Sequence, residues 1–178
     1  ADVEDVLIGC AMPEGEQGMN VARICALKAG LPDSVPAMTI NRFCSSGVQS
    51  IASAAQAIRG GQYEVAIAGG TESMTMIPMG GHKVSANPEL MEKHPEVYTS
   101  MGATAEKVAA KFNVSREDQD KFAFDSQKKA AIARTEGKLK DEIAPIKVRV
   151  FDDAGKAQEV MVSEDTIMRP ETTLEGLT

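Results

Sequence analysis

The feature that most constrains this fold is a stretch of helical length, Val48 to Arg59, in which no side chain is charged before the last residue. The stretch is built from Ala, Ser, Val, Ile and Gln. A helix that lacks a charged face is usually buried on most of its sides. Its small side chains also allow neighbouring backbones to approach closely. We therefore expect a layered fold in which this helix is buried between sheets.

Strand patterns lie on both sides of that helix. The segment Ala37–Asn41 precedes it, and Glu64–Ala68 follows it after a pair of glycines. Upstream, Val3–Ile8 is a further predicted strand, and Asn20 is the predicted N-cap of the helix that follows this strand. Strands and helices that alternate at this spacing form βαβ units. The predicted fold class is therefore α/β, with a parallel sheet covered by helices.

The composition changes near Pro78, where a segment rich in Gly, Pro and polar residues begins. This change predicts a boundary between a partial N-terminal domain, residues 1–78, and a mostly helical second part, residues 79–178. Two amphipathic helices are predicted in the second part. One runs from about Ser100 to Phe112, and the other begins after Ser115 with an S-x-x-D capping pattern.

A β-hairpin is predicted after these helices. Its strands are Ile146–Phe151 and Glu159–Val162, and the sequence Asp-Asp-Ala-Gly lies between them. Turn residues between two β-branched runs are typical of a hairpin.

The formal net charge of −7, from 19 basic and 26 acidic side chains, limits the classes of partner. Nucleic-acid binding depends on a basic footprint, which this composition does not favour. No apolar run approaches the roughly 20 residues that span a bilayer, and the acidic opening residues differ from a signal peptide. We expect a soluble, cytoplasmic protein that binds neither nucleic acid nor a membrane.

The cysteines and histidines do not predict a metal site. Cys10, Cys25 and Cys44 show no C-x-x-C spacing, and neither His82 nor His94 has a Cys or His close to it in the sequence. Structural zinc requires such clusters. We therefore expect no bound metal.

Cys44 lies where a predicted strand meets the first turn of the uncharged helix. At a helix N-terminus, unpaired backbone N–H groups and the positive end of the helix dipole stabilise an anion. A cysteine there forms the nucleophilic thiolate more readily, and its own N–H is placed to donate to an oxyanion. Position alone leaves two interpretations open: Cys44 is a catalytic nucleophile, or it is a small buried residue like most free cysteines.

The residues around Cys44 favour the first interpretation. The string Ile40-Asn41-Arg42-Phe43-Cys44-Ser45-Ser46-Gly47-Val48-Gln49-Ser50 resembles the acyl-cysteine signature of thiolases. Five further stretches resemble the same family in the same order, namely Glu14–Arg23, Gly69–Met74, Ser100–Glu106, Ser115–Gln127 and Arg169–Thr173. The chain therefore resembles an internal fragment of a thiolase, with part of the N-terminal domain and part of the loop domain that covers the active site.

The resemblance implies a reaction and roles for particular residues. Thiolases cleave a 3-oxoacyl-CoA with free CoA, giving acetyl-CoA and a shortened acyl-CoA, or catalyse the reverse condensation. Carried onto this chain, Cys44 attacks the 3-oxo carbonyl and holds the acyl group. Met101 lines the acyl pocket, unless it is a core methionine at a helix start, and Glu72 is a structural hydrogen-bonding residue rather than an acid or base. Coenzyme A is a substrate, so no cofactor is implied.

Details of the signatures point to the degradative direction. Cys44-Ser45-Ser46-Gly47 and the Ser100 that precedes Met101 resemble the 3-oxoacyl-CoA thiolases of fatty acid β-oxidation. Biosynthetic acetoacetyl-CoA thiolases more often have C-G-S-G and a histidine at these places. The biosynthetic acetyl-CoA acetyltransferase remains the alternative.

Part of the family's site is not found in these 178 residues. Thiolases also use a histidine, a second cysteine and an asparagine, in motifs of the G-H-P, C-x-G-G and N-E-A types, and none of the three motifs occurs here. The fragment alone is therefore expected to be inactive. A catalytically incomplete protein that keeps the thiolase fold is a further alternative.

An unrelated cysteine hydrolase or amidotransferase is disfavoured by the residues that flank Cys44. Such enzymes place the nucleophile in a G-x-C-x-G elbow, and here Arg42 and Ser46 occupy the two glycine positions.

The resemblance also implies an oligomer. Thiolases dimerise through the strand before the active cysteine, which in this chain is Ala37–Asn41. This strand is apolar and lacks the charges that protect an edge from pairing. We expect a homodimer or a homotetramer.

Overall fold

The computed structural model describes residues 2–178 and divides into two compact units, one as far as His94 and the other formed by Pro95–Thr178. Composition alone predicts a boundary earlier, near Pro78. Residues beyond Pro78 stay with the first unit partly because the His82 N–H donates to Glu14 Oε1 at 3.1 Å. The domain boundary at Pro78 stays a prediction.

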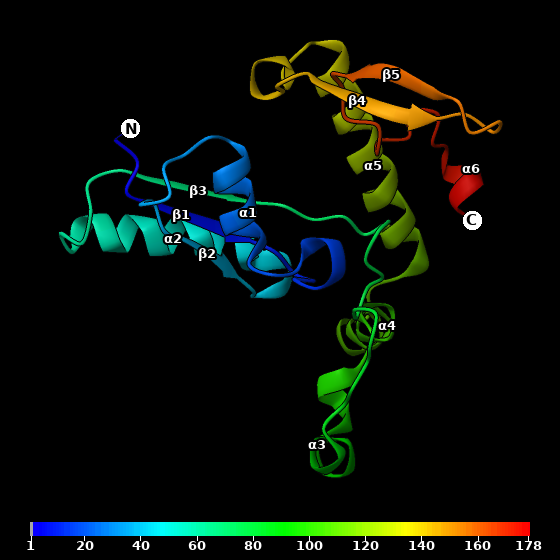
Figure 1. Ribbon diagram of the computed structural model, residues 1–178. Coiled ribbons are helices and arrows are strands. Elements are labelled where there is room, and N and C mark those ends of the chain that lie inside the picture. The colour runs from blue at the N-terminus through cyan, green and yellow to red at the C-terminus, as the bar shows by residue number, and fades with distance from the viewer. Residues whose placement is uncertain (1) are drawn as a thin grey trace. The chain divides into compact units, whose positions relative to one another are not determined.

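A parallel sheet of three strands forms the centre of the first unit (Figure 1). Its strands are β1 (Asp5–Gly9), β2 (Ala37–Ile40) and β3 (Ala66–Gly70), in the order β2-β1-β3. The register places Val6 beside Ala37 on one side and beside Ile67 on the other. The predicted parallel sheet is thus confirmed, with β3 beginning two residues later than the sequence pattern indicates.

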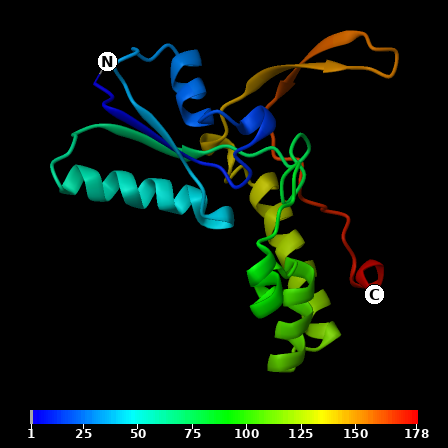
Figure 2. The same cartoon turned by 60° about the horizontal axis from the view of Figure 1, so that its bottom comes forward.

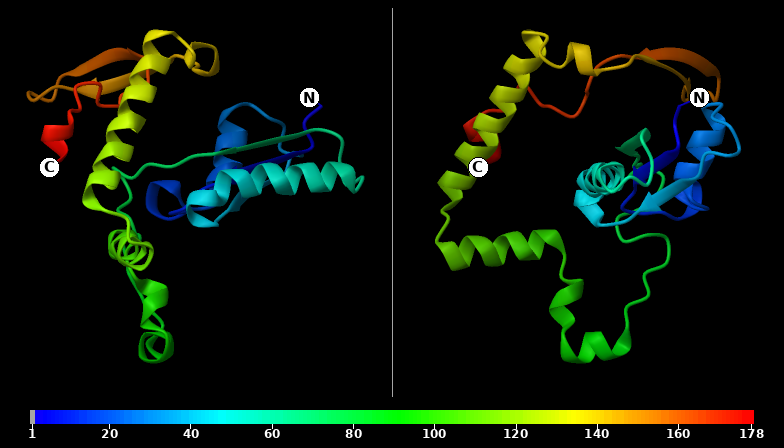
Figure 3. Two further views of the ribbon diagram at one scale, coloured as in Figure 1. Left: turned by 180° about the vertical axis from the view of Figure 1, so that it is seen from behind. Right: turned by 90° about the vertical axis from the view of Figure 1, so that its left-hand side faces the viewer.

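Two helices pack against this sheet. Helix α1 (Val21–Lys28) contacts β1 and β2, and helix α2 (Ser46–Arg59) contacts mainly β1 and β3. The two crossovers run in opposite directions along the sheet, and right-handed connections then place their helices on opposite faces. The right-hand view of Figure 3 shows the strands between the two helices.

The core of the first unit is small. On the α1 side, a cluster of Val6, Ala26 and Val35 is buried. On α2, the buried residues are Ser46, Ser50 and Ala54, which are spaced four residues apart and so form one stripe along the helix. Small side chains in this stripe allow the helix to approach the strands closely.

The prediction that this helix is buried on most sides is wrong for the described chain. Val48 is 72% exposed and Ile51 is 58% exposed. The sheet lies on one side of α2 and therefore covers only one stripe of it. The helix is uncharged on its open side, but within its unit that side has no second sheet against it.

Asn20 occupies the N-cap position of α1, but its side chain does not cap the helix. It reaches β2 instead, where its Nδ2 donates to the Ala37 carbonyl at 2.9 Å and its Oδ1 accepts from Thr39 Oγ1 at 2.8 Å. The capping acceptor is Thr39 Oγ1, 3.1 Å from the Ala22 N–H. A residue of β2 thus accepts the hydrogen bond from the first turn of α1 that the sequence pattern predicts for the Asn20 side chain.

Short elements lie between the main helices and strands. The 3₁₀ turns Gly15–Gln17 and Phe43–Ser45 precede α1 and α2, and the short helix α3 (Pro88–Lys93) and the 3₁₀ turn Pro95–Tyr98 follow β3. Asn87 caps α3 by accepting from the Leu90 N–H at 3.1 Å.

The second unit contains the predicted helices and hairpin. Helix α4 is Met101–Phe112, α5 is Arg116–Thr135, and β4 (Ile146–Phe151) pairs antiparallel with β5 (Ala157–Val162). Figure 2 shows this hairpin in orange. Ser115 caps α5 by accepting from the Asp118 N–H at 3.1 Å, as its capping pattern predicts.

The second unit has no buried residue among positions 95–178. A final short helix, α6 (Leu174–Leu177), follows the hairpin. The chain between β5 and α6 is attached to α5 by polar contacts: the Arg169 N–H donates to Gln127 Oε1 at 2.7 Å, and Arg134 forms an ion pair with Glu164. Exposed polar contacts stabilise little. Because none of its residues is buried, the second unit has no apolar core of its own.

Candidate active site

Cys44 lies in a 3₁₀ turn, Phe43–Ser45, between β2 and α2. The turn is tied to the helix start by Ser46, whose Oγ accepts from the Arg42 N–H at 2.8 Å and donates to the Phe43 carbonyl at 2.6 Å. The nucleophile candidate therefore precedes the first turn of α2, which begins at Ser46 rather than at Val48. The thiol-bearing residue is exposed.

The residue before Cys44 has an unusual backbone conformation. Phe43 has φ = 46°, in the left-handed region that bulky side chains rarely adopt. Its N–H donates to Asn41 Oδ1 at 2.9 Å, which helps to hold the turn. Strained residues of this kind gather at functional sites, and the strain here lies directly beside Cys44.

Gly9, the last residue of β1, allows the start of α2 to reach the sheet. A Cβ atom added to Gly9 would lie 2.5 Å from the Ser46 carbonyl carbon and 2.7 Å from the Gly47 nitrogen. Both are backbone atoms of the first turn of α2, which cannot move aside without moving the helix. The absence of a side chain at Gly9 thus sets how closely the Cys44 turn approaches the end of β1.

These elements line an open cavity of about 330 Å³. One wall is the segment Phe43–Gly47, which includes Cys44; the second follows β1 at Gly9 and Ala11; the third follows β3 from Gly70 to Glu72 and includes Met74. The cavity lies at the carboxyl ends of two parallel strands, where ligands bind in open α/β sheets. Cys44 is the cysteine that opens into it.

Glu72 lines this cavity but is engaged by other residues of the first unit. Its Oε2 accepts from the Ala11 N–H at 2.5 Å, and its Oε1 accepts from Gln17 Nε2 at 2.7 Å. Partial burial alone raises the pKa of the carboxyl, but hydrogen bonds from Ala11, Gln17, Met12 and Cys10 outweigh burial and hold the pKa below its usual range. Glu72 is thus a hydrogen-bonded carboxylate, in agreement with the structural role that the family resemblance implies.

Gln17 was not singled out from the sequence, although it organises this corner of the site. It is 5% exposed. Its Nε2 donates to the Met12 carbonyl at 3.0 Å as well as to Glu72, and its Oε1 accepts from the Ser73 N–H at 2.5 Å. A polar residue in a Gly-rich segment is predicted to be exposed from the sequence alone. Only the tertiary contacts show that Gln17 is buried.

The other two cysteines differ from Cys44. Cys10 is 1% exposed, just after β1, and its sulfur lies 3.8 Å from Glu72 Oε1. Burial, followed by the negative charge of Glu72, raises the pKa of the Cys10 thiol, which keeps it protonated. Cys25 is exposed on α1. Neither residue lines the cavity beside Cys44.

Met101, the second residue predicted for the site, is the first residue of α4 and is 71% exposed. Ser100 caps this helix by accepting from the Ala103 N–H at 3.4 Å. Met101 belongs to the second unit, so its place in an acyl pocket stays a prediction.

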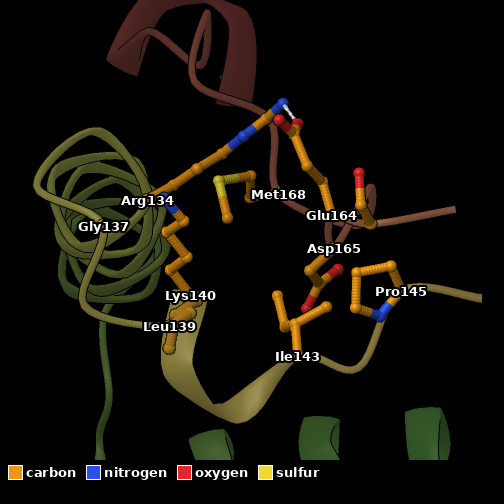
Figure 4. A pocket seen from close by; sticks show the side chains of 10 residues that line it. Arg134, Gly137, Leu139, Lys140, Ile143, Pro145, Glu164, Asp165 and Met168 are labelled. Carbon is orange, nitrogen blue, oxygen red and sulfur yellow. Dashed lines mark hydrogen bonds and ion pairs between the residues drawn. The ribbon is translucent and has the colours of Figure 1, made fainter.

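A larger cavity of about 490 Å³ lies within the second unit (Figure 4). It is lined by the end of α5, by the chain before β4 and by the chain after β5, with Arg134 and Glu164 paired at its edge. Its lining contains no cysteine or histidine. Another cavity of the second unit, of about 510 Å³ between α5 and α6, also has no cysteine or histidine in its lining. Both are larger than the cavity beside Cys44, so size does not select the candidate site.

The described residues, 2–178, contain no group of three or more His, Cys, Asp or Glu side chains that could hold a metal ion. Within the same range, no helix has the length and the apolar character that crossing a bilayer requires.

The fold and the site place the chain among α/β proteins that have a cysteine in a turn before a helix, at the carboxyl ends of parallel strands. The profile of the family described as "Thiolase, N-terminal domain" matches residues 1–178. The chain belongs to the thiolase family.

Individual relatives agree with this assignment. A 3-ketoacyl-CoA thiolase of Bacillus subtilis (strain 168) is 53% identical over 180 residues, which cover 99% of this chain and 46% of that protein. The peroxisomal 3-ketoacyl-CoA thiolase 1 of Arabidopsis thaliana is 44% identical, with 99% of this chain and 40% of that protein covered. A β-ketoadipyl-CoA thiolase of Pseudomonas putida is 43% identical, with 99% and 47% covered. The chain thus spans less than half the length of these relatives.

Proposed function

We propose that this chain forms the nucleophile-bearing part of an acetyl-CoA C-acyltransferase that cleaves 3-oxoacyl-CoA with CoA. The observation that carries the proposal is the position of Cys44, exposed in the turn before α2 and opening into a cavity at the ends of β1 and β3. Membership of the thiolase family supports it. So do the names of the relatives, several of which are 3-ketoacyl-CoA thiolases.

The proposed reaction proceeds in two transfers. The Cys44 sulfur attacks C3 of the substrate, the C2–C3 bond breaks, and its electron pair stays on C2, which takes up a proton to give acetyl-CoA. The sulfur of a second CoA then attacks the acyl carbon, and the Cys44 sulfur leaves as the acyl group passes to CoA. CoA is a substrate, and no cofactor takes part. The Cys44 N–H, before the first turn of α2, is proposed to stabilise the oxyanion, and Met101 to line the acyl pocket.

The test is to locate the acyl group. A complete thiolase polypeptide that carries these 178 residues is incubated with an acyl-CoA and analysed by intact mass and peptide mapping. We expect one acyl group per subunit, on the peptide that contains Cys44, because a thioester is the natural product of a thiolate nucleophile. An acyl group on Cys10 or Cys25, or no acyl group at all, would contradict the proposal.

The isolated 178-residue chain tests whether these residues are sufficient for thiolysis. It is expected to show no thiolysis, because the histidine that takes the thiol proton in this family lies in a motif that these residues lack. Residual reaction of Cys44 with iodoacetamide is compatible with this expectation. Thiolysis by the isolated chain would show that another group accepts the proton.

The degradative direction is the preferred form of the proposal, because Cys44-Ser45-Ser46-Gly47 matches the degradative pattern and the relatives are named for 3-ketoacyl substrates. A cytoplasmic location is also proposed. Its support is the set of three free cysteines, which suits a reducing compartment. Relatives named as peroxisomal make an organelle the alternative location.

We also propose a homodimer or homotetramer that assembles through β2. This strand is at an edge of the sheet in the order β2-β1-β3, and Met38 on it is 47% exposed. An uncharged edge strand offers unpaired backbone groups to a second copy. The complete polypeptide should therefore elute as a dimer or tetramer in size-exclusion chromatography with light scattering. A monomer at micromolar concentration would contradict this assembly.

A further inference from the structure

The cavity beside Cys44 has walls from three segments, and two of them are joined by side-chain hydrogen bonds. Ala11 follows β1 and Glu72 follows β3, and the Ala11 N–H donates directly to the Glu72 carboxylate at 2.5 Å. The backbone hydrogen bonds between the two strands end before this contact, with the Thr71 N–H donating to the Gly9 carbonyl at 2.9 Å. The Glu72 carboxylate therefore holds the two walls together past the end of the sheet.

Gln17 completes this connection from a third segment. Its amide has two donor positions and one acceptor, and all three are used: by the Met12 carbonyl, by Glu72 Oε1 and by the Ser73 N–H. Gln17 is 5% exposed, so its own polar atoms are shielded from water, and a mismatched group at position 17 is costly. Neither an acid at position 17 nor an amide at position 72 fits the hydrogen bonds that the other residue makes.

We propose that Gln17 and Glu72 act together as a positioning pair that fixes the β1 and β3 walls of the Cys44 cavity, an inference that rests on the proposed function. Glu72 carries the connection across the cavity rim, and Gln17 orients it and keeps it from acting as a free base. The hydrogen bonds that keep the pKa of Glu72 low agree with a constantly ionised, engaged carboxylate. The pair contacts no bond that is made or broken; it sets the geometry that the acyl group meets at Cys44.

The test uses exchange of the two groups in the complete thiolase polypeptide. Gln17→Glu places two carboxylates where Gln17 Nε2 and Glu72 Oε1 now lie 2.7 Å apart. In Glu72→Gln the side chain keeps one acceptor oxygen, so its NH2 group faces a donor, either the Ala11 N–H or Gln17 Nε2. Each single variant is expected to lower kcat by about 10- to 100-fold, because small displacements of a reacting group are costly. KM should change by less than about threefold, since binding of the distant CoA portion is uniform between ground and transition states.

The double variant, Gln17→Glu with Glu72→Gln, restores an amide–carboxylate hydrogen bond in the reverse direction. Its kcat is expected to be at least about threefold above that of either single variant but below that of the parent protein, because the Met12 carbonyl loses its donor. Glu16→Gln is the matched control for Glu72→Gln, because it removes the same charge at the residue next to Gln17. Glu16 only approaches His82 at 4.0 Å, so this variant should leave kcat unchanged.

Three outcomes would overturn the positioning pair: single variants with the kcat of the parent protein, losses seen in KM rather than in kcat, or a double variant no better than the single variants. A purely structural role would lower the melting temperature of the single variants without the kcat-specific loss. If instead the parent protein forms no acyl group on Cys44, the proposed function itself fails, and the acyl-transfer assay on the parent distinguishes this case from the others.

Discussion

Cys44→Ser is expected to reduce the turnover of the complete thiolase polypeptide to background, a loss on the order of 10⁴-fold or more. A serine hydroxyl at this position keeps its proton near neutral pH and is a weak nucleophile. Any ester that it formed would also be a poorer acyl donor than a thioester. The measurement is the steady-state rate of CoA-dependent cleavage of a 3-oxoacyl-CoA, together with a thermal melt. The melt should be nearly unchanged, because Cys44 is exposed.

Cys25→Ser is the matched control for this substitution. Cys25 is also exposed, but it lies on α1 and does not line the cavity. The same chemical change there is expected to leave the rate within about twofold of the parent, as is usual for surface substitutions away from a site. Retention of turnover by Cys44→Ser would contradict the assignment of the nucleophile. Loss of turnover in Cys25→Ser would show that the assay reports a general effect of cysteine removal.

Gly9→Ala is expected to lower the free energy of unfolding by about 1–3 kcal/mol and to reduce activity. The added methyl group would lie 2.5 Å from the Ser46 carbonyl carbon, a backbone atom that has no rotamer through which to move away. The first turn of α2 must therefore shift from the end of β1, and the Cys44 turn shifts with it. Urea denaturation and the rate of acylation at Cys44 measure the two effects separately.

Gly69→Ala provides the comparison within the same sheet. Gly69 is on β3, and a Cβ atom there meets only Ile8 Cδ1 at 3.9 Å, which is an ordinary contact. The free energy of unfolding should stay the same or rise by about 0.4–1 kcal/mol, because alanine reduces the freedom of the unfolded chain. Equal stability of Gly9→Ala and Gly69→Ala would mean that the start of α2 yields easily and that the Gly9 contact does not position Cys44.

Local sequence signals were sufficient where the structure depends on neighbours in the chain. The Ser115 cap and the hairpin between β4 and β5 follow the predicted patterns, because capping and turn formation use groups a few residues apart. The parallel sheet was predicted for a similar reason, since alternating strands and helices leave few topologies. The position of Cys44 between β2 and α2 follows from the same order of elements.

Contacts between segments that are far apart in the sequence could not be predicted from such local patterns. Thr39 on β2, rather than Asn20, caps α1 because the sheet brings its hydroxyl to the Ala22 N–H. The uncharged stretch of α2 predicts burial on most sides, yet a single sheet covers one stripe and leaves Val48 exposed. The composition of a helix indicates which faces tolerate burial, but only the neighbouring elements decide which faces are covered.

The sequence by itself determined the thiolase family, the α/β order of elements and Cys44 as the candidate nucleophile, because these depend on residue identity and on spacing along the chain. The tertiary structure decided how the site is built around that cysteine. The close approach of Gly9 to the start of α2 and the burial of Gln17 against Glu72 join segments far apart in the sequence. Such contacts arise only when the sheet has brought those segments together, since hydrogen bonding and steric exclusion act over a few ångströms in space, whatever the separation along the chain.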